Sequence, residues 1–274
     1  MRFPIVPGLC GAFAVLLACG VARGEDFHVE SKVYVVGDKN NKPITETTTI
    51  FYQGIVYDFL KHPGEIRDPE STIFDPAGQR FIVLDPQRKL STEISLKDTK
   101  EFLGQVRLQA AGHKDPILNF LSNPEFSEKE DKDQLEFTSA WMIYRLKTMP
   151  AKSDEIARQY GEFSHWHGQF NVMINPSSLP PFGRMAISKT LEERRLLPLE
   201  VYMTISPKGP QKKLVMRAEH RFQWTILETD RQSVSDAQRQ MKLFRQVSLK
   251  EYNERLKDDP KQLTQASQGK PARK

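Results

Sequence analysis

The sequence predicts an α+β fold: a strongly curved antiparallel sheet, an open half-barrel, with helices packed on its concave side. Residues 45–94 are rich in β-branched and aromatic residues and are broken by turn residues at short intervals, which indicates an antiparallel meander. Several of these strands are apolar at both odd and even positions, so each face needs a cover. Helical patterns at 95–110 and 153–195 supply it.

The chain opens with an export signal, Met1–Gly24. An apolar run is followed by small residues at the −3 and −1 positions, which predicts cleavage before Glu25. The run is too short for a transmembrane anchor. Leu16–Cys19 resembles a bacterial lipobox, so cleavage before Cys19, with lipidation of that cysteine, is the alternative.

These features predict an exported protein of the periplasm or cell envelope, associated with a membrane only if Cys19 is lipidated. Both cysteines lie in the signal, so the mature chain has no disulfide. The composition, 27% charged and 38% hydrophobic, is typical of a soluble globule. The net charge of +5 loses Arg2 and Arg23 with the signal, which leaves +3, so no nucleic-acid partner is expected.

The first strand is expected at 27–36, where apolar and polar residues alternate, and 37–43 is a polar turn. Residues 45–60 form one long bent strand or a hairpin that tightens at Gln53–Gly54. At a period of two, one face of this segment carries Phe51, Ile55, Tyr57 and Phe59, and the other carries Ile50, Tyr52, Val56 and Leu60.

Three more strands are expected, at about 66–74, 80–84 and 89–94. Asp75 and Asp85 lie in the two connections between these strands, and each is followed by a proline. These two aspartates are interpreted as turn residues rather than as a catalytic carboxylate pair, because Asp and Pro open β-turns.

A helix begins at Ser95, which has capping-box spacing to Asp98, and ends at Gly112. A helical turn at 117–121, an edge strand with a turn at 124–132, and a strand at 135–147 follow. The next helices are expected at 153–170 and 182–195, separated by a loop at 175–181. They form a helical insertion at about 151–195.

Strands return at 199–205 and 213–227. The second alternates, with an apolar face from Leu214 to Ile226 and a mostly polar face opposite. Helices begin at Ser235 and again at Ser248, each with a capping-box partner. One domain, 25–257, is therefore expected, followed by a disordered basic tail at 258–274.

No motif identifies an enzyme, because the chain has no nucleophile elbow, P-loop or dinucleotide fingerprint. His165 and His167 are the strongest enzymatic signal, since on a strand they would share a face. On the expected helix they diverge by about 200°, and no third ligand is evident. Neither a metal nor another cofactor is expected, and the question of enzymatic activity stays open, with a binder favoured.

The apolar residues on both faces of the sheet indicate either a closed core or a curved sheet that holds a ligand on its concave side. His220 lies on the apolar face of its strand, as a core histidine or one that contacts the ligand. The candidate cavity-wall residues are Phe51, Tyr57, Phe59, Phe81, Val83, Met216, His220, Phe222 and Trp224.

The run TIFDPAGQRFIVLD, continued by QRKLSTEI, resembles the LolA/LolB-like superfamily of periplasmic lipoprotein carriers and outer-membrane lipoprotein-sorting proteins. The resemblance covers about 45–103. It implies an open antiparallel half-barrel with helices on the concave side, where acyl chains bind. The helix that usually precedes the first strand is missing, the helical block before Leu199 is larger, and no functional residue is transferred.

The sequence thus predicts a cell-envelope protein that binds a lipid, a lipoprotein acyl chain or another apolar ligand in a half-barrel cavity. Each buried methylene would contribute about 0.8 kcal/mol. One alternative is a structural or interaction protein of the envelope with a closed core and a protein partner. A second alternative is an exported metal-dependent hydrolase that uses the region of His165 and His167.

Overall fold

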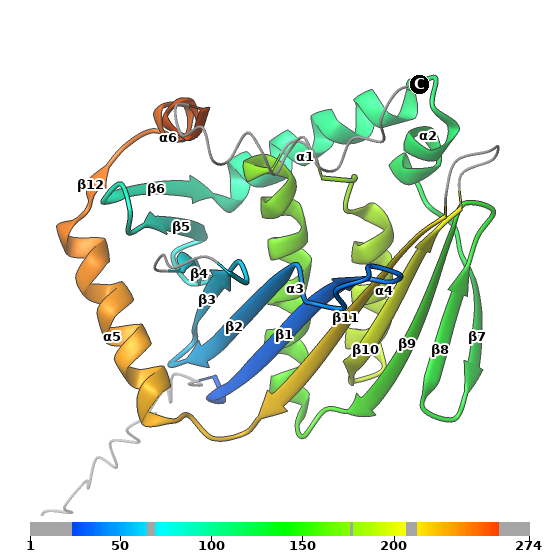
Figure 1. Ribbon diagram of the computed structural model, residues 1–274, viewed down its shortest axis with the longest axis horizontal. Coiled ribbons are helices and arrows are strands. Elements are labelled where there is room, and N and C mark those ends of the chain that lie inside the picture. Colours follow the sequence, from blue (N-terminus) through cyan, green and yellow to red (C-terminus); the bar gives the residue numbers. More distant parts are fainter. Residues whose placement is uncertain (1–23, 65–68, 176–177, 207–212, 258–274) are drawn as a thin grey trace, which may run out of the picture.

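The computed structural model describes residues 24–64, 69–175, 178–206 and 213–257. These residues form six helices and one mixed, mostly antiparallel sheet of twelve strands, so the α+β class is confirmed (Figure 1). The strand order is β12-β6-β5-β4-β3-β2-β1-β11-β10-β9-β8-β7, and the sheet does not close into a barrel. The predicted tail lies outside the described residues, as does the predicted signal except Gly24.

The strands are β1 (Phe27–Val35), β2 (Thr45–Tyr52), β3 (Ile55–Lys61), β4 (Glu70–Asp75), β5 (Arg80–Asp85), β6 (Leu90–Ser95), β7 (Ser127–Asp131), β8 (Gln134–Thr138), β9 (Met142–Pro150), β10 (Leu196–Ile205), β11 (Leu214–Gln223) and β12 (Arg245–Gln246). The helices are α1 (Leu96–Ala111), α2 (Pro116–Ser122), α3 (Asp154–Ile174), α4 (Phe182–Glu193), α5 (Glu228–Leu243) and α6 (Leu249–Lys257).

The segment 45–60 is a hairpin, and this changes which residues share a face. Gln53 and Gly54 both have positive φ, 53° and 79°, as a two-residue hairpin turn requires. Phe51 therefore pairs with Val56 across the turn, and Ile50 pairs with Tyr57. The predicted grouping of Phe51 with Tyr57 was wrong, because alternation cannot be counted through a turn.

Two other expectations were wrong. Residues 135–147 are not one strand, because a turn at Ser139 separates β8 from β9. Helix α5 begins at Glu228 rather than at Ser235, which lies inside it. The carboxylate of Asp230 fixes the earlier start, since it accepts hydrogen bonds from the Leu227 backbone N–H and from His28.

Helix α3 packs on one face of the sheet and supplies most of the main core. The Ser153 hydroxyl caps its first turn by accepting a hydrogen bond from the Ile156 N–H. Phe163 meets Phe51 edge to face at 5.7 Å between ring centroids, and Phe170 stacks on Phe81 at 4.4 Å. The face that carries Phe51 and Phe81 is the α3 face below.

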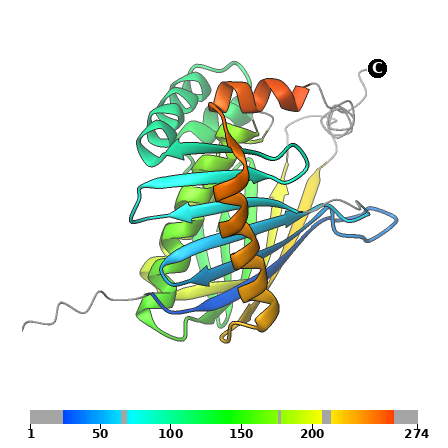
Figure 2. The same ribbon diagram turned by 90° about the vertical axis from the view of Figure 1, so that its left-hand side faces the viewer.

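Helix α5 covers the opposite face of the same strands, as Figure 2 shows. Its Val234 and Ala237 are buried in a cluster with Ile50 and Tyr57. This opposite face is the α5 face below. The strands β2–β5 are thus covered on both sides, which explains their apolar residues at odd and even positions.

A second core lies at the other end of the sheet. There Ile187 and Leu191 of α4, together with Leu121 of α2, pack against β8, β9 and β10. In the described part of the chain, no helix is both long enough and apolar enough to cross a membrane.

Candidate functional site

Seven of the nine candidate wall residues lie on the α3 face, and two lie on the α5 face. On the α3 face, Phe51 and Phe81 are fully buried and Val83 is 3% exposed. All three belong to the core beneath α3. A ligand could reach them only by displacing side chains of α3.

Tyr57 and Phe59 face α5 instead. The Gln238 amide donates a hydrogen bond of 3.0 Å to the Tyr57 hydroxyl, and burial raises the pKa of Tyr57. These two residues are therefore on the other side of the sheet from Phe51 and cannot form one wall with it.

The remaining four candidates, Met216, His220, Phe222 and Trp224, follow one another on the α3 face at and just beyond β11, and all are half-buried. Phe222 contacts Tyr160 of α3 edge to face at 5.3 Å and stacks on Trp224 at 5.8 Å. They border a larger apolar surface whose side chains are also only partly buried.

This open apolar surface lies on the α3 face of β1, β10 and β11. Val33 and Val35 pair across to Ala218 and Met216, which pair in turn with residues of β10. All of its side chains are half-buried, although each strand has a neighbour on both sides. Its residues are Val33, Val35, Val201, Met203, Met216 and Ala218.

A polar row separates the open apolar surface from the core beneath α3. Strand register aligns Ser31 with His220 and with Thr47, and Thr49 with Asp58. The His220 Nδ1 and the Ser31 Oγ are 2.8 Å apart, and the Thr49 hydroxyl donates a 2.5 Å hydrogen bond to Asp58. The polar row therefore consists of Ser31, Thr47, Thr49, Asp58 and His220.

Asp58 is a carboxylate in an apolar setting, 6% exposed. Burial raises its pKa to about 6, against smaller lowering effects of the Thr49 hydrogen bond and the charge of Arg184. His167 of α3 faces it, with Nε2 3.7 Å from the carboxylate, and burial lowers the His167 pKa to about 3. This histidine is therefore neutral at pH 7.

Arg184 of α4 is an exposed cation. Burial is the main influence on the pKa of Asp58, Tyr144, Tyr160, His167 and His220, and the charge of Arg184 lowers each of these pKa values further. One guanidinium therefore acts on groups from β3, β9, α3 and β11. Arg184 forms no salt bridge with any residue that the structure describes.

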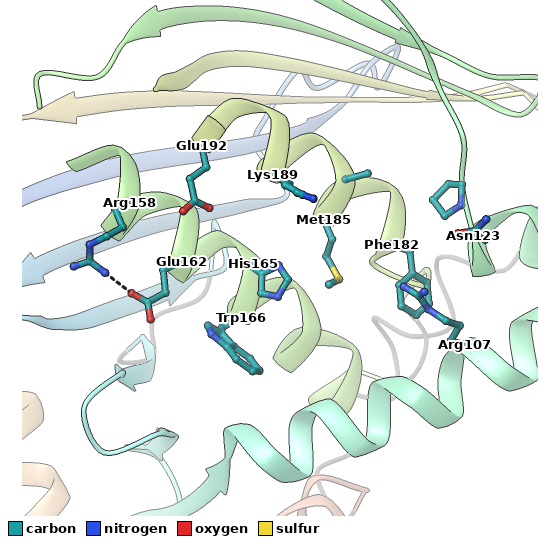
Figure 3. A pocket seen from close by; sticks show the side chains of 12 residues that line it. Arg107, Asn123, Arg158, Glu162, His165, Trp166, Phe182, Met185, Lys189 and Glu192 are labelled. Atoms are coloured by element: carbon teal, nitrogen blue, oxygen red, sulfur yellow. Dashed lines mark hydrogen bonds and ion pairs between the residues drawn. The ribbon is translucent and has the colours of Figure 1, made fainter. Parts of the chain in front are cut away.

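A separate groove of about 560 Å³ lies on the outer side of α3 and α4, next to the ends of α1 and α2 (Figure 3). Trp166 and Met185 point into it, Arg107 lies over the Phe182 ring at 4.3 Å, and Arg158 pairs with Glu162. The groove residues are Arg107, Asn123, Pro124, Arg158, Glu162, His165, Trp166, Phe182, Met185, Ala186, Lys189 and Glu192.

His165 and His167 lie on different sides of α3, as the helical spacing predicts. His165 lines the outer groove, and burial lowers its pKa, whereas His167 faces the sheet. Across the described ranges, no three His, Cys, Asp or Glu side chains gather in an arrangement suited to a metal ion. The geometry therefore offers no support for the metal-dependent hydrolase.

Sequence reasoning missed Asp58 and Arg184. The available signal for Asp58 was a lone acid between Val56 and Leu60, at positions expected to be apolar. For Arg184 no signal existed, because an exposed arginine near the start of a helix is common. No protein-family model matches this chain, and no curated protein matches it either.

Proposed function

We propose that this is an exported cell-envelope protein that binds an apolar ligand, such as a lipid or a lipoprotein acyl chain, against the open apolar surface. One observation carries the proposal: Val33, Met216 and Ala218 lie in the middle of a twelve-stranded sheet and are only partly buried. Equivalent positions on β2 and β5, such as Phe51 and Phe81, are fully buried.

The proposal includes the curved, half-barrel shape of the sheet that the sequence predicts. In it the sheet curves so that β1 and β11 diverge from α3 and α4, and the open apolar surface lines the concave side. The ligand then replaces the cover that α3 gives to β2–β6. The resemblance to LolA/LolB-like carriers, proteins that hold acyl chains between a sheet and helices, supports this arrangement.

The energetics suit an acyl chain. Burial of apolar surface contributes about 0.8 kcal/mol for each methylene removed from water, so a chain of about ten carbons gains several kcal/mol before the cost of association. The methionines Met203 and Met216 suit such a ligand, because their flexible thioether side chains adapt to ligands of different shape.

Two matched substitutions on β11 test the proposal. Ala218→Trp fills the open apolar surface, whereas Val215→Trp places the same side chain on the opposite face of the same strand. Titration with the apolar fluorescent probe N-phenylnaphthylamine is expected to show at least a tenfold loss of affinity for Ala218→Trp only. Equal binding by both variants and the unchanged protein would contradict the proposal.

The outer groove is the second candidate location, because its volume of about 560 Å³ lies within the range of small-ligand sites. Ala186→Trp, on α4, would fill it. Loss of probe binding in Ala186→Trp, with Ala218→Trp unaffected, would move the ligand to the groove. Loss in neither variant would favour an interaction protein with a closed core.

A further inference from the structure

We propose that the outer groove is a second, separate binding site, which takes a short apolar peptide by its two charged ends. The ammonium group of the peptide lies at Glu192 and its carboxylate lies at Arg107, with apolar side chains between them. This inference does not depend on the proposed function, because no groove residue belongs to the open apolar surface.

The groove follows the helices α3 and α4, which run antiparallel. A Cβ on Gly161 of α3 would lie 2.6 Å from the Glu192 carboxylate, so this glycine leaves room for that side chain. One on Gly168 would lie 3.9 Å from Pro181, next to the start of α4 at Phe182. At about 1.5 Å per residue, the two ends of the groove are roughly 10–15 Å apart. An extended peptide of about four residues spans that length.

One end of the groove is acidic. Arg158 pairs with Glu162 at 3.0 Å and with Glu155 at 2.7 Å, so one guanidinium is already shared by two carboxylates. Glu192 points toward these residues in Figure 3, and it forms no salt bridge with any residue that the structure describes. Burial, and then the charge of Glu162, raises the pKa of Glu192. A ligand ammonium group would supply the cation that this end lacks.

The opposite end is basic. The Arg107 guanidinium of α1 lies over the Phe182 ring, 4.3 Å from its centroid, and the side chain is exposed. Asn123 lines the same end, as Figure 3 shows. Within the described ranges, Arg107 has no acidic partner. A guanidinium stacked on an aromatic ring keeps its in-plane N–H groups free to donate two hydrogen bonds to a carboxylate.

The middle of the groove is apolar and open. Trp166 and Met185 point into it and are only partly buried, and Ala186 is exposed. The volume of about 560 Å³ lies within the range of small-ligand sites. An uncharged ligand would leave both ends without a partner, and a ligand with one charge would satisfy only one of them. A short apolar peptide with free termini satisfies both ends and the middle.

Three forms of one tetrapeptide of alanine and leucine test the two ends separately: the free peptide, its N-acetyl form and its C-terminal amide. Calorimetry titrates each form into the unchanged protein, Glu192→Gln and Arg107→Gln. The charge-matched controls are Glu101→Gln and Lys100→Gln, exposed residues of α1 outside the groove. Circular dichroism checks that the variants fold.

The unchanged protein is expected to bind the acetylated and amidated forms at least tenfold more weakly than the free peptide. Glu192→Gln should weaken the free and amidated forms but not the acetylated one, and Arg107→Gln should weaken the free and acetylated forms but not the amidated one. Both controls should bind as the unchanged protein does.

Equal binding of all three forms by the unchanged protein, or binding of none, would overturn the peptide site. Loss of peptide binding in Ala218→Trp, which fills the open apolar surface, would overturn it as well, because it would place the peptide on the sheet. None of these results bears on binding of the apolar probe, so the proposed function is tested separately.

Discussion

Asp58 shows how a single residue can oppose the stability of the fold. Its carboxylate is buried between strands, and at pH 7 it is ionised at a free-energy cost, because its pKa of about 6 exceeds the ordinary value of 3.8. A side chain kept at such a cost is a candidate for function.

Asp58→Asn is expected to raise the free energy of unfolding near pH 7.5 by about 1–3 kcal/mol. The amide oxygen still accepts the Thr49 hydrogen bond, and the buried charge is gone. The gain should be small near pH 4 and grow until about pH 6, because the unfolded carboxyl ionises first. Urea unfolding at several pH values measures it, with exposed Asp38→Asn as control. A variant less stable at pH 7.5 would contradict this account.

The neighbouring histidines His167 and His220 have the opposite effect on the pH dependence of stability. Burial lowers the pKa of His167 to about 3 and that of His220 to about 4. Between pH 6.5 and 4 these histidines are therefore protonated in the unfolded chain but neutral in the folded chain. Stability that they contribute at neutral pH is therefore lost as the pH falls. With two histidines against one aspartate, acidification should destabilise the protein.

At the scale of elements, α3 connects the core to the polar row. Its phenylalanines fill the space over β2 and β5, and His167, on the same side of the helix, reaches Asp58. The helix also separates the outer groove from the sheet (Figure 3). Its first turn depends on Ser153.

Ser153→Ala is expected to destabilise the protein by about 1 kcal/mol, because the Ile156 N–H loses the hydroxyl oxygen that accepts its 3.1 Å hydrogen bond. Ser153→Thr keeps that acceptor and should retain most of the stability. Chemical denaturation of the three proteins gives the comparison. Equal stability of the alanine and threonine variants would show that the cap does not contribute to the free energy of unfolding.

The elements were predictable where local chemistry determines them. The turns at Asp75 and Asp85 formed as predicted: each carboxylate accepts a hydrogen bond from a backbone N–H three residues later. The cap at Ser95 was also predicted correctly. The shared face of Phe51 and Tyr57 was wrong, because a two-residue turn reverses the alternation. The contact between His167 of α3 and Asp58 of β3 depends on packing between distant segments, which no local pattern encodes.

At the scale of the whole molecule, the sheet is open and has two ends, β12 and β7. Every residue of β7 is exposed, and four of its five side chains are charged. Charged edge strands prevent sheets of different molecules from pairing. The composition of β7 therefore opposes pairing at this end of the sheet.

Replacing Lys129 and Asp131 together with valine should promote self-association through β7, since it removes two charges of opposite sign and raises strand propensity. Light scattering after size exclusion would show an apparent mass that rises with concentration. The control replaces Lys97 and Glu101, an exposed ion pair on α1, in the same way. Monomeric behaviour of the β7 variant would contradict the role of the charges.

The location of the ligand is the central claim, and photo-crosslinking tests it most directly. A dodecanoate with a diazirine near its methyl end is bound to the protein, irradiated, and the labelled peptides are identified by mass spectrometry. The account predicts labels on β1, β10 or β11, at residues such as Val33, Met203 or Met216. Labels confined to Trp166 and Met185 of the outer groove, or no specific label, would contradict it.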